Sequence, residues 1–167
     1  MNNLIENRRS VRKFEAGKSI TKEQINQLLT AAMMAPSACN SRPWEFIAVT
    51  KREVMNEIVA IHQHAQMCET ASAAIIIVAI PQKGVPEGYY PQDCAAAAEN
   101  ILLEAVSMGL GTCWCGIYPK DDNVASFRKA FNIKEPKIPF CVIAIGTPAE
   151  SPKQRGFFEE SKVKYMD

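Results

Sequence analysis

Residues 73–80, AAIIIVAI, form a continuous run of small and β-branched side chains that ends at Pro81. In a strand, alternate side chains point to opposite faces, and here neither alternate set is polar. Proline ends such a run because it has no backbone N–H to donate to a sheet. The stretch therefore predicts a buried strand that is covered on both faces.

Three other segments also have strand composition. They are 44–49 (WEFIAV), 112–118 (TCWCGIY) and 140–145 (FCVIAI). Each is rich in aromatic and β-branched residues, which fit a pleated, half-buried surface. We expect these three strands to accompany the strand at 73–80.

Helical patterns fill the intervals between the strands. Residues 21–24 (TKEQ) form a capping box that opens a helix, and this helix ends before Pro36. Residues 50–53 (TKRE) have the same pattern and predict a second capping box at the start of the next helix. Apolar residues recur at helical spacing after both boxes.

Residues 93–108 carry an alanine-rich apolar stripe and are followed by Gly109, a typical C-terminal cap. We expect this segment to be the central, most buried helix. An acidic residue opens another helix over 121–131. The chain has no repeat, low-complexity block or internal linker, so residues 1–167 are predicted to form a single α+β or α/β sandwich domain. Periodicity alone leaves both classes open.

The charges are nearly balanced, with 19 basic and 18 acidic residues and a net charge of +1. This balance gives no global field that would attract nucleic acid or an anionic membrane. The longest apolar run, 71–81, is too short to cross a bilayer, and no apolar signal region follows the N-terminus. We expect a soluble, cytoplasmic protein.

The cysteines lack the dense spacing of a secreted disulfide scaffold, so reduced thiols are expected. They are Cys39, Cys68, Cys94, Cys113, Cys115 and Cys141. Only Cys113 and Cys115 are close in sequence, and no further ligands at matched spacing indicate a metal site. Cys39 is expected to be a packed thiol rather than a redox group. The two histidines, His62 and His64, are expected on the surface.

Several segments carry groups that could bind a phosphorylated ligand. Residues 8–14 (RRSVRKF) place three guanidiniums and a hydroxyl within five positions, and arginine forks match phosphate oxygens. A solvated basic helix end would have the same composition. The loop 35–44 (APSACNSRPW) offers amide and hydroxyl groups but also resembles an ordinary turn. Residues 153–155 (KQR) add two cations in a polar tail.

The segment 109–114 (GLGTCW) follows a predicted helix and enters a predicted strand, which is the reverse of the dinucleotide-binding order. The chain also shows no hydrolase-type serine motif and no evident acid–base pair. A chain that has segments able to bind phosphate but lacks these catalytic groups is typical of an enzyme whose bound cofactor carries the chemistry.

Taken in order, the segments 8–14, 35–44, 95–114 and 153–155 resemble the nitroreductase family of FMN enzymes. The resemblance extends over nearly the whole chain. It implies an α+β sandwich with a central, mostly antiparallel sheet flanked by helices and a long buried central helix. It also implies a homodimer with FMN at the interface, in which a C-terminal arm, residues 147–167, embraces the partner.

The resemblance assigns cofactor contacts residue by residue. Arg8, Arg9, Ser10 and Arg12 match the motif for the FMN phosphate, ribityl chain and pyrimidine edge, and Lys153 and Arg155 match a C-terminal phosphate clamp. Pro36, Ser37, Ala38 and Asn40 match the loop that covers the partner's flavin; Thr112, Cys113 and Trp114 match a wall of the pocket, and Gln92 matches a position near the ring. Arg12 is a candidate for electrostatic stabilisation of the reduced ring.

The implied activity is ping-pong transfer of a hydride from NAD(P)H through FMN to a nitroaromatic, quinone or similar acceptor. Ala38 and Cys39 depart from the family pattern, and the loop 81–91 is too short for the substrate-covering lid of longer members. Other FMN chemistry on the same fold therefore stays open: an ene-reductase, a reductive dehalogenase or a flavin-fragmenting enzyme. A non-catalytic flavin-binding redox sensor and a plain interaction domain are the alternatives from other classes.

Overall fold

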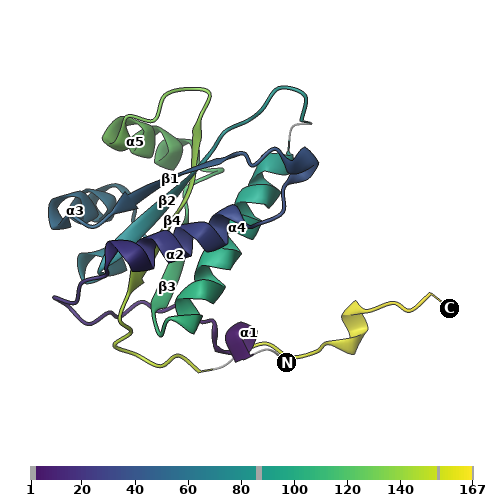
Figure 1. Ribbon diagram of the computed structural model, residues 1–167, viewed down its shortest axis with the longest axis horizontal. Coiled ribbons are helices and arrows are strands. Elements are labelled where there is room, and N and C mark those ends of the chain that lie inside the picture. The colour runs from purple at the N-terminus through teal and green to yellow at the C-terminus, as the bar shows by residue number, and fades with distance from the viewer. Residues whose placement is uncertain (1–2, 86–87, 154, 167) are drawn as a thin grey trace.

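The computed structural model describes residues 3–85, 88–153 and 155–166. Within them, an antiparallel sheet has the order β1-β2-β4-β3. The strands are β1 (Trp44–Val49), β2 (Ala73–Ala79), β3 (Gly111–Gly116) and β4 (Ile138–Gly146). Helices pack on both faces (Figure 1), so the protein is the predicted α+β sandwich.

Strand β2 is buried along its whole length, as the sequence predicts. Ala74, Ile76 and Val78 belong to one apolar cluster, which includes residues of α3 and α5. Ile75 and Ile77 belong to a second cluster on the opposite face, with residues of α2 and α4. The two clusters explain why neither alternate set of side chains in this strand is polar.

Helix α4 (Tyr89–Ser107) is the long central helix, and it begins four residues before the predicted start. Pro91 lies in its first turn, where a backbone N–H would have no intrahelical partner, so the proline does not delay the helix. At the other end Gly109 has φ +71°, and the Leu110 N–H donates to the Ala105 carbonyl at 2.8 Å. This is the expected glycine cap.

Two predicted capping boxes have different outcomes. In α2 (Lys22–Met33), the Thr21 hydroxyl accepts from the Gln24 N–H and the Gln24 side chain accepts from the Thr21 N–H. The box predicted at 50–53 is wrong, because α3 (Arg52–Ile61) has Lys51 as its N-cap and no side-chain cap. The helix starts one residue later than the pattern requires.

Helix α5 (Asp121–Phe131) has the predicted bounds, whereas the two strands around it differ slightly. Strand β3 ends two residues early because Ile117 and Tyr118 both donate to the Phe140 carbonyl at 3.0 Å. Strand β4 begins two residues early. Its register shifts opposite Ile77 and Val78, a bulge that accommodates Pro139 inside the strand.

The prediction that His62 lies on the surface is wrong, because its side chain is buried with 2% exposure. Its Nε2 donates to the Gly116 carbonyl at 2.9 Å, and its Nδ1 accepts from the His64 N–H at 3.2 Å. The ring is therefore a satisfied core histidine. His64 is exposed, as predicted.

All six cysteines are free thiols, as predicted, and five of them are buried. Cys39 is the exception: it is exposed in this chain, which contradicts its prediction as a packed thiol. Its φ of 53° turns the backbone into the left-handed region within a short 3₁₀ segment, η1 (Ala38–Asn40). This local turn lifts the side chain away from the core.

The last described stretch of the chain, residues 155–166, runs away from the body of the molecule (Figure 1). Phe157, Phe158 and Tyr165 are 81%, 71% and 71% exposed there. The segment's regular structure among the described residues is a short 3₁₀ turn, η3 (Glu160–Lys162). The remaining short elements are α1 (Asn3–Asn7) and η2 (Gln66–Glu69). No helix in the described residues is long and apolar enough to cross a membrane.

Candidate functional site

The N-terminal segment crosses the open edge of the sheet at β3. Ser10 forms a parallel bridge with Thr112, and the Val11 N–H donates to the Thr112 carbonyl at 2.8 Å. The segment then meets the chain after β4, where the Ala149 N–H donates to the Lys13 carbonyl at 2.8 Å. Three segments that are distant in sequence therefore meet at one edge of the sheet.

Two glycines allow this crossing. A Cβ on Gly111 would lie 2.9 to 3.0 Å from the side-chain carbons of Val11. A Cβ on Gly146 would lie 3.0 Å from the Phe14 ring and 3.1 Å from the Ser72 nitrogen. The closest contact at Gly111 is shorter than real Cβ atoms make, and those at Gly146 are tighter than usual, so a larger residue at either position would force the N-terminal segment to shift on the sheet.

Glu150 fixes the backbone beside the basic segment. Its Oε1 accepts from the Arg12 N–H at 2.6 Å and from the Lys13 N–H at 3.1 Å. Charge-assisted bonds of this kind are among the stronger hydrogen bonds in proteins. Sequence reasoning missed Glu150, because no local pattern links an acidic residue to a backbone 138 positions away.

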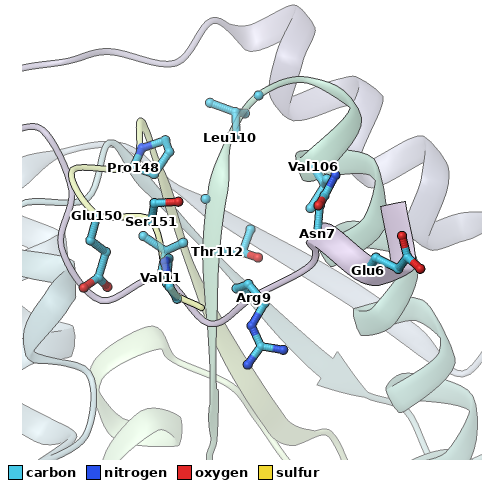
Figure 2. A pocket seen from close by; sticks show the side chains of 13 residues that line it. Glu6, Asn7, Arg9, Val11, Val106, Leu110, Thr112, Pro148, Glu150 and Ser151 are labelled. Carbon is cyan, nitrogen blue, oxygen red and sulfur yellow. The ribbon is translucent and has the colours of Figure 1, made fainter. Parts of the chain in front are cut away.

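The backbone of this segment is extended, so its three arginines, which are the predicted phosphate ligands, point in different directions. Arg8 pairs through Nε with Glu99 of α4 at 3.3 Å. Arg9 and Val11 instead line a cavity of about 360 Å³, together with residues 109–112 and the chain after β4 (Figure 2). Arg9 Nε is buried and has no hydrogen-bond partner among the described residues. Arg12 is exposed.

The predicted wall residues of β3 form a buried edge. Thr112 and Cys113 are buried, and Trp114 is half-buried with its ring 6.0 Å from that of Phe140. A hydrogen bond with the Cys115 thiol lowers the pKa of Cys113 to about 7, helped by the Arg12 guanidinium and opposed by burial. The same hydrogen bond raises the pKa of Cys115. The strand therefore holds one acidic thiol next to a basic segment.

The other predicted contacts lie at the opposite end of α4. The Ala38 N–H donates to Asp93 Oδ1 at 3.0 Å, and the Arg42 N–H donates to Ser37 Oγ at 2.9 Å. Pro36 and Asn40 belong to the same loop, and Gln92 is exposed on the first turns of the helix.

The distance between the two groups follows from the helix. Residues 92 and 108 are sixteen positions apart, or about 24 Å along an α-helix. The loop and Gln92 are therefore far from the cavity at the C-terminal end of α4, whereas Arg8, through Glu99, lies only about 10 Å along the helix from Gln92.

Two predicted phosphate contacts, Lys153 and Arg155, are exposed, and Gln154 lies outside the described residues. Ser151 and Pro152, just before them, line the cavity that contains Arg9. The described chain has no group of three or more His, Cys, Asp or Glu side chains that could hold a metal ion.

A model of the nitroreductase family matches residues 5–67 and 59–147, which include α1 to β4 and the basic segment. The chain belongs to the nitroreductase family. This nitroreductase-family chain is 42% identical over 159 residues to a protein of Methanothermobacter thermautotrophicus, which carries a provisional name as an NADH dehydrogenase/NAD(P)H nitroreductase. The match covers 95% of this chain and 83% of that protein.

Solved structures show the same family fold over the whole chain. A crystal structure from Clostridium acetobutylicum, provisionally named an NADH oxidase, has a TM-score of 0.92 and 40% identity, covering 98% of this chain and 99% of that one. An FMN-dependent nitroreductase from Clostridium difficile has a TM-score of 0.90 and 27% identity, covering 100% and 99%. These coverages mean that the likeness of fold extends over nearly the whole of each of these chains.

Proposed function

We propose that this family member is an FMN-dependent NAD(P)H oxidoreductase that reduces nitroaromatic, quinone or similar acceptors by a ping-pong mechanism. The observation that carries the proposal is the junction of residues 8–12, 111–114 and 147–152 at the edge of β3, where separate segments bring cations and hydroxyls together. The names of the relatives support the same interpretation: one is named an FMN-dependent nitroreductase, and another is provisionally named an NADH dehydrogenase/NAD(P)H nitroreductase.

The donor set at this junction fits a flavin phosphate. Arg9 Nε is a buried donor without a partner among the described residues, and such a group gains most from an anionic acceptor. Arg8, Ser10 and Arg12 add donors in the same segment, and Lys153 and Arg155 follow the cavity-lining chain. We assign these residues to the FMN phosphate, ribityl chain and pyrimidine edge.

FMN, when bound, would accept a hydride from NAD(P)H and pass it to the acceptor. The protein's part is to bind and orient. Buried Thr112 and Cys113 and half-buried Trp114 would form a wall against the ring, and their strand is held rigid by β4. Arg12 would place positive charge at the pyrimidine edge, with its backbone fixed by Glu150.

The resemblance to the family supports a dimeric site in which one chain's loop covers the other chain's flavin. We therefore assign Pro36, Ser37, Ala38 and Asn40, together with Gln92, to the flavin of the partner. The exposed aromatic residues Phe157, Phe158 and Tyr165 would pack on that partner as the arm 147–167. Removing residues 156–167 should shift the mass in solution from dimer toward monomer, as measured by light scattering.

The first experiment is an absorbance spectrum of the purified protein before and after anaerobic addition of NADH or NADPH. A bound-flavin spectrum that bleaches supports the reductase and identifies its donor. Bound flavin that neither donor bleaches would indicate a non-catalytic flavin protein. A spectrum without flavin that added FMN does not change would contradict the proposal. Steady-state assays with a panel of acceptors would then separate nitro and quinone reduction from other flavin chemistry.

The phosphate contacts are tested by comparing FMN with riboflavin, which lacks the phosphate. Wild-type protein should bind FMN more tightly, and Arg8→Ala or Arg9→Ala should weaken FMN binding by about tenfold to a hundredfold, the size of a lost hydrogen bond to a charged group. Riboflavin binding should change little. Lys129→Ala, which alters an exposed cation on α5, is the matched control.

A further inference from the structure

A second cavity, of about 620 Å³, lies at the N-terminal end of α4, at the opposite end of the helix from the cavity in Figure 2. Its walls come from the loop before β1, the loop after β2, the start of α4 and the chain after β3. The residues that matter to the argument are Ser41, Pro43, Lys83, Tyr90, Asp93 and Tyr118. None of them was assigned to the flavin site above.

Two polar atoms at this cavity are buried and have no hydrogen-bond partner among the described residues: Asp93 Oδ2 and Ser41 Oγ. Asp93 is only 6% exposed. Its other oxygen, Oδ1, is engaged by the Ala38 N–H at 3.0 Å. Buried carboxylate oxygens are almost always paired, so the unpaired Oδ2 indicates a donor that a bound molecule would supply.

The walls of the cavity favour a flat apolar body. Tyr90 and Tyr118 meet edge to face with ring centroids 5.9 Å apart, and Tyr118 stacks on Phe140 at 6.4 Å. Pro43 adds a rigid apolar surface that is itself buried. Aromatic rings prefer offset-stacked and edge-to-face neighbours, so a ring is the body that these walls accept best.

The charges of the described residues that line the cavity favour a neutral ligand over a cation. Asp93 contributes one negative charge, but Lys83 also lines the cavity and the N-terminus of α4 carries a partial positive charge. The two loops are tied together, because Gln82 Nε2 donates to the Ser41 carbonyl at 2.8 Å. This hydrogen bond therefore fixes the shape of the cavity. The charges of its described lining residues nearly balance, and it contains a hydrogen-bond acceptor.

The geometry points to a second small-molecule site that binds a neutral, flat aromatic or heteroaromatic ring carrying an N–H or O–H donor, with the donor bonded to Asp93 Oδ2. The site goes beyond the proposed oxidoreductase function and needs no flavin. It contains an acceptor, aromatic walls and enough volume for a bicyclic ring, which are the features of small-molecule sites in general.

The test uses indole and 1-methylindole, in which a methyl group replaces the N–H donor. Each is titrated into the protein as purified, and the backbone amide signals are followed by NMR. Indole should shift the amides of Ser41, Gln82 and Tyr90 and should bind at least about fivefold more tightly than 1-methylindole, because only indole can donate to a carboxylate. Shifts restricted to residues 111–116 would place indole at the flavin site and overturn the inference.

Asp93→Asn is the sharper test. The Ala38 N–H still needs an acceptor, so the amide oxygen stays on that side and the amide NH₂ replaces Oδ2. Indole should then bind about tenfold more weakly, and its preference over 1-methylindole should vanish. An unchanged indole affinity in this variant would overturn the inference, as would the absence of saturable indole binding by wild-type protein. If Asp93→Asn does not fold, the ratio of the two affinities in wild-type protein still decides.

Discussion

The interior strand β2 and the edge strand β3 are built from similar residues but have different roles. Every residue of β2 is buried, and its two faces meet two separate apolar clusters. Strand β3 pairs with β4 on one side, and on its other side it receives the short bridge from Ser10. The comparison teaches that the interior supplies stability, whereas the open edge collects the polar segments that we assign to the cofactor.

The largest expected effect is a loss of stability from a substitution in an interior strand, and it tests whether stability and cofactor binding are separate roles. Ile143 of β4 is fully buried, and truncation to alanine would leave a cavity between the sheet and the layer of α2 and α4. Ile143→Ala should lower the free energy of unfolding by about 2–5 kcal/mol. Denaturant titration measures this loss, and the FMN affinity of the protein that stays folded should not change. A large fall in FMN affinity without a loss of stability would contradict the division.

The next effect comes from the edge. Gly111→Ala brings a Cβ against Val11 and should cost about 1–3 kcal/mol as overpacking, and it should weaken FMN binding by displacing the basic segment. Gly116→Ala is the matched control, because its Cβ would meet only the Tyr118 carbonyl at 3.8 Å. The double variant Val11→Ala/Gly111→Ala should recover part of both losses. Equal effects of the two glycine substitutions would show that the crossing is unimportant.

A smaller, pH-dependent effect concerns the cysteines, because the thiol of Cys113 on the edge strand β3 should ionise at a lower pH than the thiol of Cys141 on the interior strand β4. The pKa of Cys113 is lowered to about 7, chiefly by the Cys115 thiol, so a thiolate should form as the pH rises through that value. Burial raises the pKa of Cys141 on β4, so this thiol should stay protonated there. In Cys115→Ala the pKa of Cys113 should rise, and less thiolate should be present at pH 8.

Absorbance at 240 nm, taken as a difference from Cys113→Ser, follows the thiolate directly. A midpoint near pH 7 that survives in Cys115→Ala would show that the thiol contact is not its cause.

The smallest effect lies outside the sheet and tests the two capping patterns. Thr21→Ala removes a hydroxyl that accepts from the Gln24 N–H and should cost about 1 kcal/mol. Thr50→Ala should change the stability by less than about 0.5 kcal/mol, because Lys51 is the N-cap and no side chain caps α3. Chemical denaturation of both variants makes the comparison. Equal losses of stability in the two variants would show that Thr50 does cap α3, as the pattern at 50–53 predicts.

The residues that the sequence could not place share one property: their partners are distant along the chain. Asp93 holds Ala38 from 55 positions away, and Glu150 holds Arg12 from 138 positions away. His62 is held by Gly116, 54 positions away. An acidic residue inside the alanine-rich central helix was a signal for Asp93 that sequence reasoning passed over. Glu150 offered no such signal in its polar surroundings.

The sequence by itself determined the strands and the main helices, because periodicity and caps are local properties of the chain. Its short motifs determined the family, and the α+β class followed from the family resemblance rather than from periodicity. Only the tertiary structure decided that Arg9 lines a cavity while Arg8 pairs with Glu99. It also left Asp93 Oδ2 buried and unpaired among the described residues. The physical reason is that side-chain direction and burial depend on contacts between distant segments, and these exist only once the chain has folded.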